Sequence, residues 1–480
     1  MPTRRTPYSR KNPKAPRAYS RTRRHAGGPT HASPGSFRIG GRASHGADRP
    51  QRRPTELDRT AISWETSSGS FSLTRRQLLI GAAAIVGIGI VGAGGSAIYQ
   101  QVSAASSGDV SVLEVPEGAV TTTDSLTMAE TSACVSLIGN FELTYGTQLW
   151  CNDGAVAACL VPSDTSTPLA SAALLWLSSG SLQTVLAQAV GDAEGFDIYD
   201  VRATAQALVW VEQNILEGTW RIYSAALADG TPGQAALMQE GTTDEWEVPL
   251  IAAVGGKAFW QVLPNIEGPF ATEASTLNAA QAGDAADAHV VCESDGRMCT
   301  APYALSDSLV ITPRAATSGT YYRLVLIDAE SEAELDSLVL PQAMRPQDAG
   351  YGDTGFTFTF DAIYNYGEGI SQLGSYAPAS DARGADYSGA PWFRYTRTPG
   401  AAPAWCGRYF VAKSASNVVG VDFASGSYFV LDREDGADDY GDYIASTGAG
   451  DTLVTFSNID STPIVGDARR CCLVRVWAPL

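Results

Sequence analysis

The feature of this sequence that most constrains its fold is a β-prone run that recurs at nearly regular spacing. Seven runs each carry an aromatic or branched residue, and they reach positions 150, 210, 260, 310, 358, 410 and 454. Their intervals of 60, 50, 50, 48, 52 and 44 residues match the length of four short strands with turns. The spacing predicts an all-β domain of repeated antiparallel sheets, with each run in the second strand of its sheet. The runs are Leu149-Trp150, Val209-Trp210, Phe259-Trp260, Leu309-Val310, Phe356-Thr357-Phe358, Tyr409-Phe410 and Leu453-Val454.

A second kind of run follows in several repeats and ends at a turn. Residues 220–228 alternate between apolar and polar and are followed by Asp229-Gly230, a strong hairpin signal. Similar runs occupy residues 174–180, 322–328 and 419–426. The pattern resembles the blades of TolB-like and WD40-like β-propellers over nearly all of residues 110–480, although no Trp-Asp repeat motif is present. The seven recurrences favour seven blades, with six or eight as alternatives, and a pair of β-sandwiches is the competing architecture.

A ring of sheets must be closed, because an open ring leaves two sheet edges unpaired. Val110–Val115 and Leu473–Trp477 both have the composition of strands. We therefore expect the strand at 110–115 to complete the last blade beside 473–477, which is how many propellers close.

The segment before this domain resembles a twin-arginine export signal. A threonine precedes paired arginines, and hydrophobic residues follow after one free position, but Ile80 stands where the family usually has lysine. The motif residues are Thr74, Arg75, Arg76, Leu78 and Leu79. The resemblance implies passage through the twin-arginine translocase.

The hydrophobic stretch after the motif is long enough to cross a membrane. Leu78–Ile98 carries no charge over 21 residues, which as a helix span about 31 Å. Positive charge lies on its N-terminal side, so we expect the N-terminus in the cytoplasm and residues 110–480 outside. Small residues near Ala104 offer a cleavage site, so the domain is either a single-pass membrane protein or secreted after cleavage there.

Charge is distributed very unevenly. Residues 1–76 carry 17 Lys/Arg and 4 Asp/Glu, whereas the remainder carries 16 basic and 47 acidic residues, a net charge of −31. The basic segment has few apolar residues, so we expect a disordered tail. The acidic remainder would be repelled by nucleic acid, which is therefore excluded as a partner.

The eight cysteines all follow residue 130, as expected for a domain that forms disulfides in an oxidising compartment. Cys292 and Cys299 flank an Asp-Gly turn, and opposed positions on such a hairpin have the separation that a disulfide needs. We expect a disulfide between these two residues. Cys134 is a further candidate for bonding to Cys471 or Cys472.

The sequence contains little that indicates catalysis. There is no Gly-x-Ser-x-Gly motif, and the only histidine downstream of the hydrophobic stretch is His289, within what we expect to be a surface loop. We therefore assign no catalytic residue, no cofactor and no strong metal site. Asp435, Asp438 and Asp439 belong to the densest acidic run and are a weak calcium candidate.

An aromatic-rich segment is the candidate ligand loop. Tyr376, Tyr387 and Trp392 lie amid Gly, Ala and Ser, and aromatic faces on long loops hold sugars or peptides in many surface proteins.

The whole chain is therefore expected to have four parts. These are a basic cytoplasmic tail over 1–76, a transmembrane or signal helix over 77–99, a linker over 100–109 and a propeller over 110–480. The function we expect is a cell-surface binding or protein-interaction scaffold for an unknown ligand. The alternative is a secreted carbohydrate-active hydrolase that uses two carboxylates in the propeller channel.

Overall fold

The computed structural model describes twelve segments of the chain: residues 60–66, 69–74, 120–163, 168–315, 321–340, 345–352, 355–360, 373–376, 392–394, 402–414, 416–461 and 468–480. The chain divides into two units, Met1–Ile90 and Val91–Leu480, each taken by itself below. Regular structure in the described residues consists of β-strands and single turns of 3-10 helix. The prediction of an all-β fold is confirmed.

The described residues of the first unit form an antiparallel hairpin of β1 (Thr60–Thr66) and β2 (Gly69–Thr74). The rest of the tail that the sequence analysis expects over residues 1–76 lies outside the described residues. Arg75, Arg76 and the predicted span over 77–99 lie outside the described residues. No helix among the described residues is long and apolar enough to cross a membrane.

The second unit begins with four antiparallel sheets in chain order, each built mainly from strands that are neighbours in sequence. The first contains β6 (Gln148–Trp150), β7 (Val156–Pro162), β8 (Ala170–Trp176) and β9 (Ser181–Leu186). The second contains β10 (Asp197–Ala203), β11 (Ala207–Asn214), β12 (Thr219–Ala228), β13 (Thr231–Pro232) and β14 (Ala236–Thr242). The third contains β15 (Leu250–Val254), β16 (Lys257–Val262), β17 (Ser275–Gln281) and β18 (His289–Ser294). The fourth contains β19 (Tyr303–Ala304), β20 (Ser308–Ile311), β21 (Arg323–Asp328) and β22 (Glu334–Val339).

The remaining sheets combine C-terminal strands with strands from the beginning of the unit. A pair, β23 (Pro346–Tyr351) and β24 (Phe356–Phe360), lies next to β25 (Leu373–Tyr376), β26 (Trp392–Arg394) and β3 (Val120–Thr122). Another sheet has the order β32 (Gly448–Gly450), β27 (Ala404–Cys406), β28 (Tyr409–Ser414), β29 (Asn417–Asp422), β30 (Ser427–Val430) and β4 (Thr127–Met128). The last has the order β31 (Tyr443–Ile444), β33 (Leu453–Ser461), β34 (Arg469–Pro479) and β5 (Val135–Leu143).

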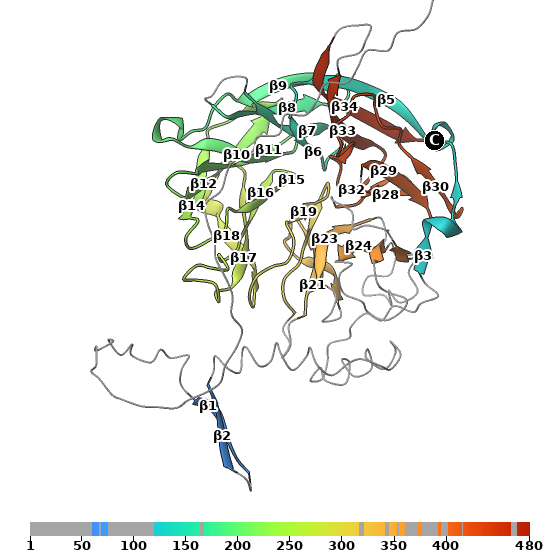
Figure 1. Cartoon of the computed structure of the whole chain (residues 1–480). Coiled ribbons are helices and arrows are strands. Elements are labelled where there is room, and N and C mark those ends of the chain that lie inside the picture. Colours follow the sequence, from blue (N-terminus) through green and yellow to red (C-terminus); the bar gives the residue numbers. More distant parts are fainter. Residues whose placement is uncertain are drawn as a thin grey trace, which may run out of the picture. The chain divides into compact units, whose positions relative to one another are not determined.

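Each sheet packs face to face on the next one around a ring, with the first strand of most sheets near the centre (Figure 1). Separate buried clusters lie between successive sheets: Trp210 packs with residues of β7 and β8, and Phe259 packs with residues of β20 and β21. A further cluster joins the last sheet to the first, where Val474 and Phe456 pack with Leu175. Sheets that bury both faces against neighbours in a closed ring form a β-propeller.

The recurring runs lie in the predicted strands with one exception. Trp210, Trp260, Val310, Phe358 and Val454 lie in the second strand of their sheets, and Phe410 lies in β28, the second of the four consecutive strands β27–β30. Trp150 is the exception, because it lies in the innermost strand β6, and the second strand β7 (Val156–Pro162) contains alanines and a cysteine but no aromatic residue. The hairpin predicted at Asp229-Gly230 is confirmed: Ala228 pairs with Thr231, and both turn residues have positive φ.

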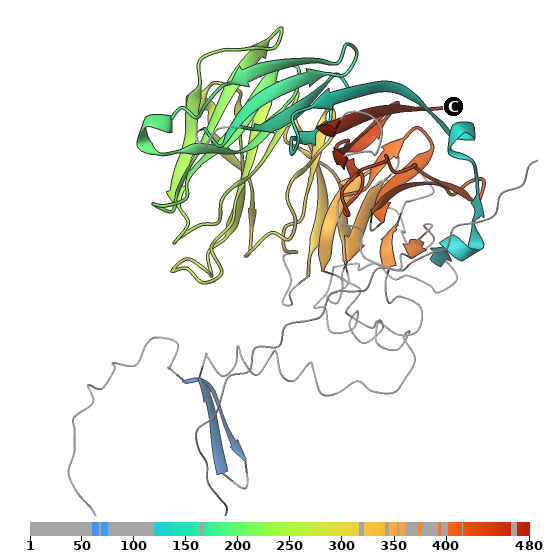
Figure 2. The same ribbon diagram turned by 45° about the horizontal axis from the view of Figure 1, so that its top comes forward.

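An N-terminal strand completes the last sheet, as expected, but it is not the predicted one. β5 pairs antiparallel with β34 from Val135↔Pro479 to Leu143↔Cys472, and Figure 2 shows β5 in teal running along β34 in dark red. The segment 110–115, which the sequence suggested, lies outside the described residues. The nine-residue length of β5 and its direct connection to β6 explain why this strand pairs with β34.

Candidate binding site

A cavity lies where the last sheet meets the first, between the innermost strands β6 and β31. Its volume is about 390 Å³, and nine residues from β6, the turn before it, β31 and β33 line it. We call it the β6–β31 cavity. Its lining residues are Gly146, Thr147, Gln148, Leu149, Trp150, Tyr443, Ile444, Phe456 and Asn458. None of these side chains carries a charge.

The turn between β5 and β6 is fixed by contacts to the last sheet. Gly146 N–H donates to Asn458 Oδ1 at 2.9 Å, and the Cys472 thiol donates to the Thr147 carbonyl at 3.4 Å. Gly146 has φ of +85°, which favours glycine at this position. Asn458 thus contributes to the cavity lining and also fixes the turn.

The aromatic rings of the cavity are held by cations from neighbouring sheets. The Arg202 guanidinium lies 4.0 Å from the centre of the Trp150 ring, and Lys413 Nζ lies 4.2 Å from that of Tyr443. Tyr443 and Phe456 stack with ring centres 5.3 Å apart and an angle of 23° between the ring planes. These contacts hold the rings in place before any ligand arrives, which lowers the entropic cost of binding.

Beyond the opposite end of β6, hydrogen bonds join residues of several sheets. Asn152 Nδ2 donates to the carbonyls of Ala253 at 3.0 Å and Leu305 at 2.9 Å, which belong to two other sheets. Thr447 Oγ1 donates to the Ala304 carbonyl at 2.6 Å, and Ala205 N–H donates to Asp153 Oδ2 at 2.9 Å. These bonds join the loops that connect first and second strands, so the innermost strands are cross-linked at this face.

Two described carboxyl groups have raised pKa values. Burial raises the pKa of Asp442, against the lowering effect of Arg475, whose guanidinium pairs with it inside the last sheet. Burial also raises the pKa of Asp348 to about 6, and Thr359 Oγ1 at 3.4 Å offsets this only in part. Two unpaired buried carboxyl groups in one channel would favour a hydrolase. Within the described residues, Asp348 has no ion-pair partner, whereas Asp442 does.

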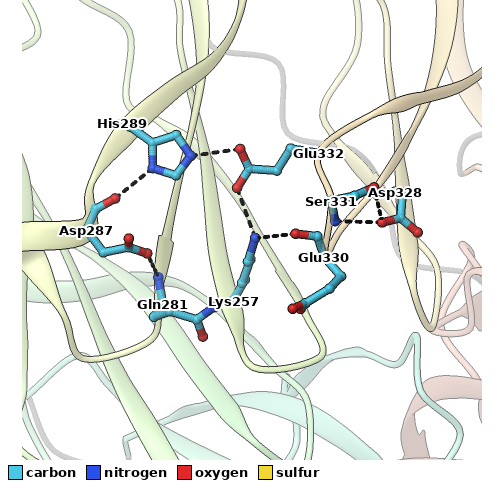
Figure 3. Close-up of polar contacts among 8 residues, drawn as sticks. All are labelled: Lys257, Gln281, Asp287, His289, Asp328, Glu330, Ser331 and Glu332. Carbon is cyan, nitrogen blue, oxygen red and sulfur yellow. Dashed lines mark hydrogen bonds and ion pairs between the residues drawn. The ribbon is translucent and has the colours of Figure 1, made fainter.

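His289 belongs to a network between two sheets (Figure 3). Its Nε2 lies 2.7 Å from Glu332 Oε2, and its Nδ1 lies 2.7 Å from the Asp287 carbonyl. Lys257 Nζ donates to Glu332 Oε1 at 3.0 Å and to the Glu330 carbonyl at 2.9 Å. Because both ring nitrogens face acceptors, the network favours the imidazolium, and the bonds to Asp287 and Glu332 raise the pKa of His289. This is the geometry of a bridge between the β15–β18 and β19–β22 sheets.

The network predicts a pH-dependent contribution to stability. A histidine whose pKa is raised by folding stabilises the protein below its unfolded pKa, and this stabilisation is lost as pH rises through the folded pKa. Replacing His289 by Gln should therefore lower the free energy of unfolding by about 0.5 kcal/mol near pH 5.5, and by less near pH 8. Denaturant unfolding at both pH values measures this. If the difference in the free energy of unfolding between the protein and its His289→Gln variant grows with pH, the bridge is not made by a protonated histidine.

The disulfide expected between Cys292 and Cys299 is absent, because all eight cysteines are free thiols. Cys292 lies in β18, which pairs with β17, but residues after the Asp-Gly sequence do not return along β18. Instead, Cys299 N–H donates to the Thr312 carbonyl at 3.1 Å, and its thiol donates to that of Pro346. The expected hairpin is therefore wrong. Cys134 also has a free thiol, in a cluster with Cys406.

The other candidate residues are not brought together in a site. Trp392 is buried in the core, edge to face with Phe358 at 5.4 Å, so it is not a loop residue that faces a ligand. Tyr376 lies in β25 opposite Trp392, and Tyr387 lies outside the described residues. No three described His, Cys, Asp or Glu residues are grouped as metal ligands. Asp438 instead accepts from the N–H groups of Tyr440 and Gly441, while Asp435 and Asp439 are exposed.

Sequence reasoning identified Trp150 only as part of a strand and missed Tyr443 and Asn458 altogether. The one signal in the sequence for a different role of Trp150 was its spacing. It precedes the next run by 60 residues, whereas the other intervals are 44 to 52 residues.

No protein-family model and no curated protein sequence matches the chain. Among solved structures, a prolyl endopeptidase is similar with a TM-score of 0.43 and 10% identity, over 87% of this chain and 56% of that one. Oligopeptidase B from Leishmania major has a TM-score of 0.43 and 9% identity, over 73% and 48%. The propeller domain of the Trilobed protease from Pyrococcus furiosus has a TM-score of 0.39 and 9% identity, over 70% and 97%. The chain thus spans about half the length of the two peptidases, and its fold assignment rests on the sheet topology.

Proposed function

We propose that the chain is an exported, membrane-tethered propeller of seven blades that acts as a cell-surface binding scaffold. The observation that carries this proposal is the β6–β31 cavity, a preformed concave site with aromatic and amide groups at the junction of the first and last sheets. The count of seven treats β23–β26 as one blade, since β25 packs beside β24. Export rests on the twin-arginine-like motif and the uncharged stretch after it.

The lining of the cavity favours a neutral carbohydrate as the ligand. Trp150 and Phe456 provide apolar ring surface, while Gln148, Asn458 and Thr147 provide neutral hydrogen-bonding groups. The C–H groups of a sugar ring pack on aromatic rings, and its hydroxyls pair with amides, whereas a phosphate or carboxylate ligand would need a cation among the lining residues. The volume accommodates one or two sugar rings.

Labelled neutral oligosaccharides applied to intact cells that express the full chain test both parts of this proposal, because such probes do not cross membranes. We expect binding at the surface, and a roughly tenfold loss of affinity in Gln148→Ala, since one hydrogen bond contributes about 1 kcal/mol or more. Gln206→Ala is the matched control, because Gln206 is an exposed glutamine in the loop between β10 and β11 and does not line the cavity.

Three outcomes would count against the proposal. Binding that appears only after permeabilisation would contradict the external location. Absence of binding in both preparations would contradict the ligand class, and equal losses of affinity in both glutamine variants would contradict the cavity as the site.

Asp348 is the observation that favours the alternative, a carboxylate-dependent hydrolase, because a general acid needs a raised pKa. Cleavage of the probe that is lost in Asp348→Asn would support that alternative instead.

A further inference from the structure

Exposed aliphatic side chains lie on the face of the ring opposite to the one that carries the Asn152 and Asp153 contacts. Four loops of the β6–β9, β10–β14 and β15–β18 sheets form this part of the face: residues 187–196, 215–218, 243–249 and 263–274. Each loop either joins second to third strands or leads from a last strand to the next sheet, so all four lie on the same side. Val190, Ile215, Leu216 and Ile266 expose 54, 65, 95 and 67% of their surface there. Grouped exposed aliphatic residues mark an interaction site, whereas single ones do not.

These loops are tied to one another, so the aliphatic side chains are held outward on a rigid base. Asn214 Nδ2 donates to the Glu194 carbonyl at 3.0 Å, which links the first loop to the second. Thr243 N–H donates to the Gly218 carbonyl at 2.7 Å, which links the second to the third. Asn265 Nδ2 donates to the Thr243 carbonyl at 2.6 Å, which links the third to the fourth. A surface ordered in this way loses little entropy when a partner binds.

A buried carboxylate anchors the first of these loops. Glu212 is fully buried and accepts hydrogen bonds from Val190 N–H at 2.6 Å and Gly191 N–H at 2.9 Å. Trp210 Nε1–H donates to the same carboxylate at 2.9 Å. The position of Val190 therefore follows from the core of the second sheet.

The four loops carry acidic residues and no basic ones. Their eight carboxylates have no Lys, Arg or His beside them in the loop sequences. Glu194 pairs with Arg221 at 2.8 Å and Glu247 pairs with Arg297, while the structure pairs none of the other six with a described cation. The eight are Asp192, Glu194, Glu217, Asp244, Glu245, Glu247, Glu267 and Glu273. Such a surface repels anionic lipid and nucleic acid and attracts cationic groups.

We propose that these four loops, which we call the acidic face, dock a basic segment of a partner polypeptide. Aliphatic side chains of the segment pack on Ile215, Leu216 and Ile266, and its lysines or arginines lie next to the surrounding carboxylates. This arrangement of apolar contacts within a charged rim is that of a protein–protein interface. The docking surface is separate from the β6–β31 cavity and does not depend on any ligand there.

The experiment uses the full chain and a synthetic 16-residue peptide of lysine and leucine, with binding measured at low and at physiological salt. We expect saturable binding that weakens with salt, and at least a tenfold loss of affinity in the double variant Ile215→Ser/Leu216→Ser. The matched control is Leu137→Ser/Ile138→Ser, which changes two adjacent exposed aliphatic residues in β5. The charge variant Glu217→Gln/Glu267→Gln should lose affinity as well, whereas Asp435→Asn/Asp439→Asn should not.

Several results would overturn the proposal. One is equal affinity for an all-lysine peptide, because contacts with the aliphatic residues would then contribute nothing. Another is equal loss in the two aliphatic double variants, which would place the site elsewhere. A third is tighter binding of a peptide with the sequence of residues 4–24 of this chain than of the lysine and leucine peptide. The occupant of the acidic face would then be the chain's own basic segment and not a partner.

Discussion

A chain that lacks β5 should lose most of its stability, because this strand alone closes the last sheet. We compare chains that begin at residues 117, 134 and 144; the first two retain β5 (Val135–Leu143), and the third does not. Removal of β5 exposes the edge of β34 and uncovers buried side chains in the two clusters beside it. Because each buried aliphatic side chain contributes about 1.5–3 kcal/mol, the thermal midpoint should fall by about 10 °C or more, with aggregation.

The two longer chains serve as controls for loss of the preceding residues. The step from 117 to 134 removes β3 and β4, which pair over only two or three residues, so its effect should be far smaller. Melting curves of the three purified chains measure both steps. If the chain that begins at 144 melts at the same temperature as that which begins at 134, β5 is not required for closure.

Replacing Arg475 by Met should be the most destabilising single change. Arg475 and Asp442 form an ion pair with side chains 6% and 1% exposed, and Arg475 Nη1 also donates to the Asp432 carbonyl at 2.9 Å. Without the guanidinium, Asp442 is left as a buried carboxylate, which costs about 3–5 kcal/mol. Burial already raises the pKa of Asp442, so the loss should increase with pH as ionisation of the unpaired acid becomes more costly.

Urea unfolding at pH 5 and pH 8 measures this effect. Arg470→Met is the matched control on the same strand, because Arg470 pairs with Asp460 at 3.5 Å while both side chains are more than half exposed. Its effect should stay within about 0.5 kcal/mol. The double variant Arg475→Met/Asp442→Leu should recover much of the lost stability, since the buried carboxylate is removed together with its partner. Equal destabilisation by the single and double variants would show that packing, and not the charge, is responsible.

Local patterns in the sequence were sufficient for the strands and for the kind of fold. Trp210, Trp260 and Phe358 mark second strands because a strand that is buried on both faces needs large apolar residues, and the ring repeats that requirement in successive sheets. Asp229-Gly230 marks its hairpin because both positions need positive φ. The assignment of Trp150 to the second strand of the first sheet was wrong. The second strand β7 buries small residues there, and the aromatic residue lies in the neighbouring strand β6.

The sequence by itself therefore determined the all-β class and the repeat, because both depend on residues close together in the chain. Only the tertiary structure decided which strand closes the ring, where the cavity lies and which loops form the acidic face. Gly146 and Asn458 meet across 312 positions, and Asn152 reaches Leu305 across 153. No local pattern encodes such contacts, because they arise when the packing of successive sheets brings the first and last of them together.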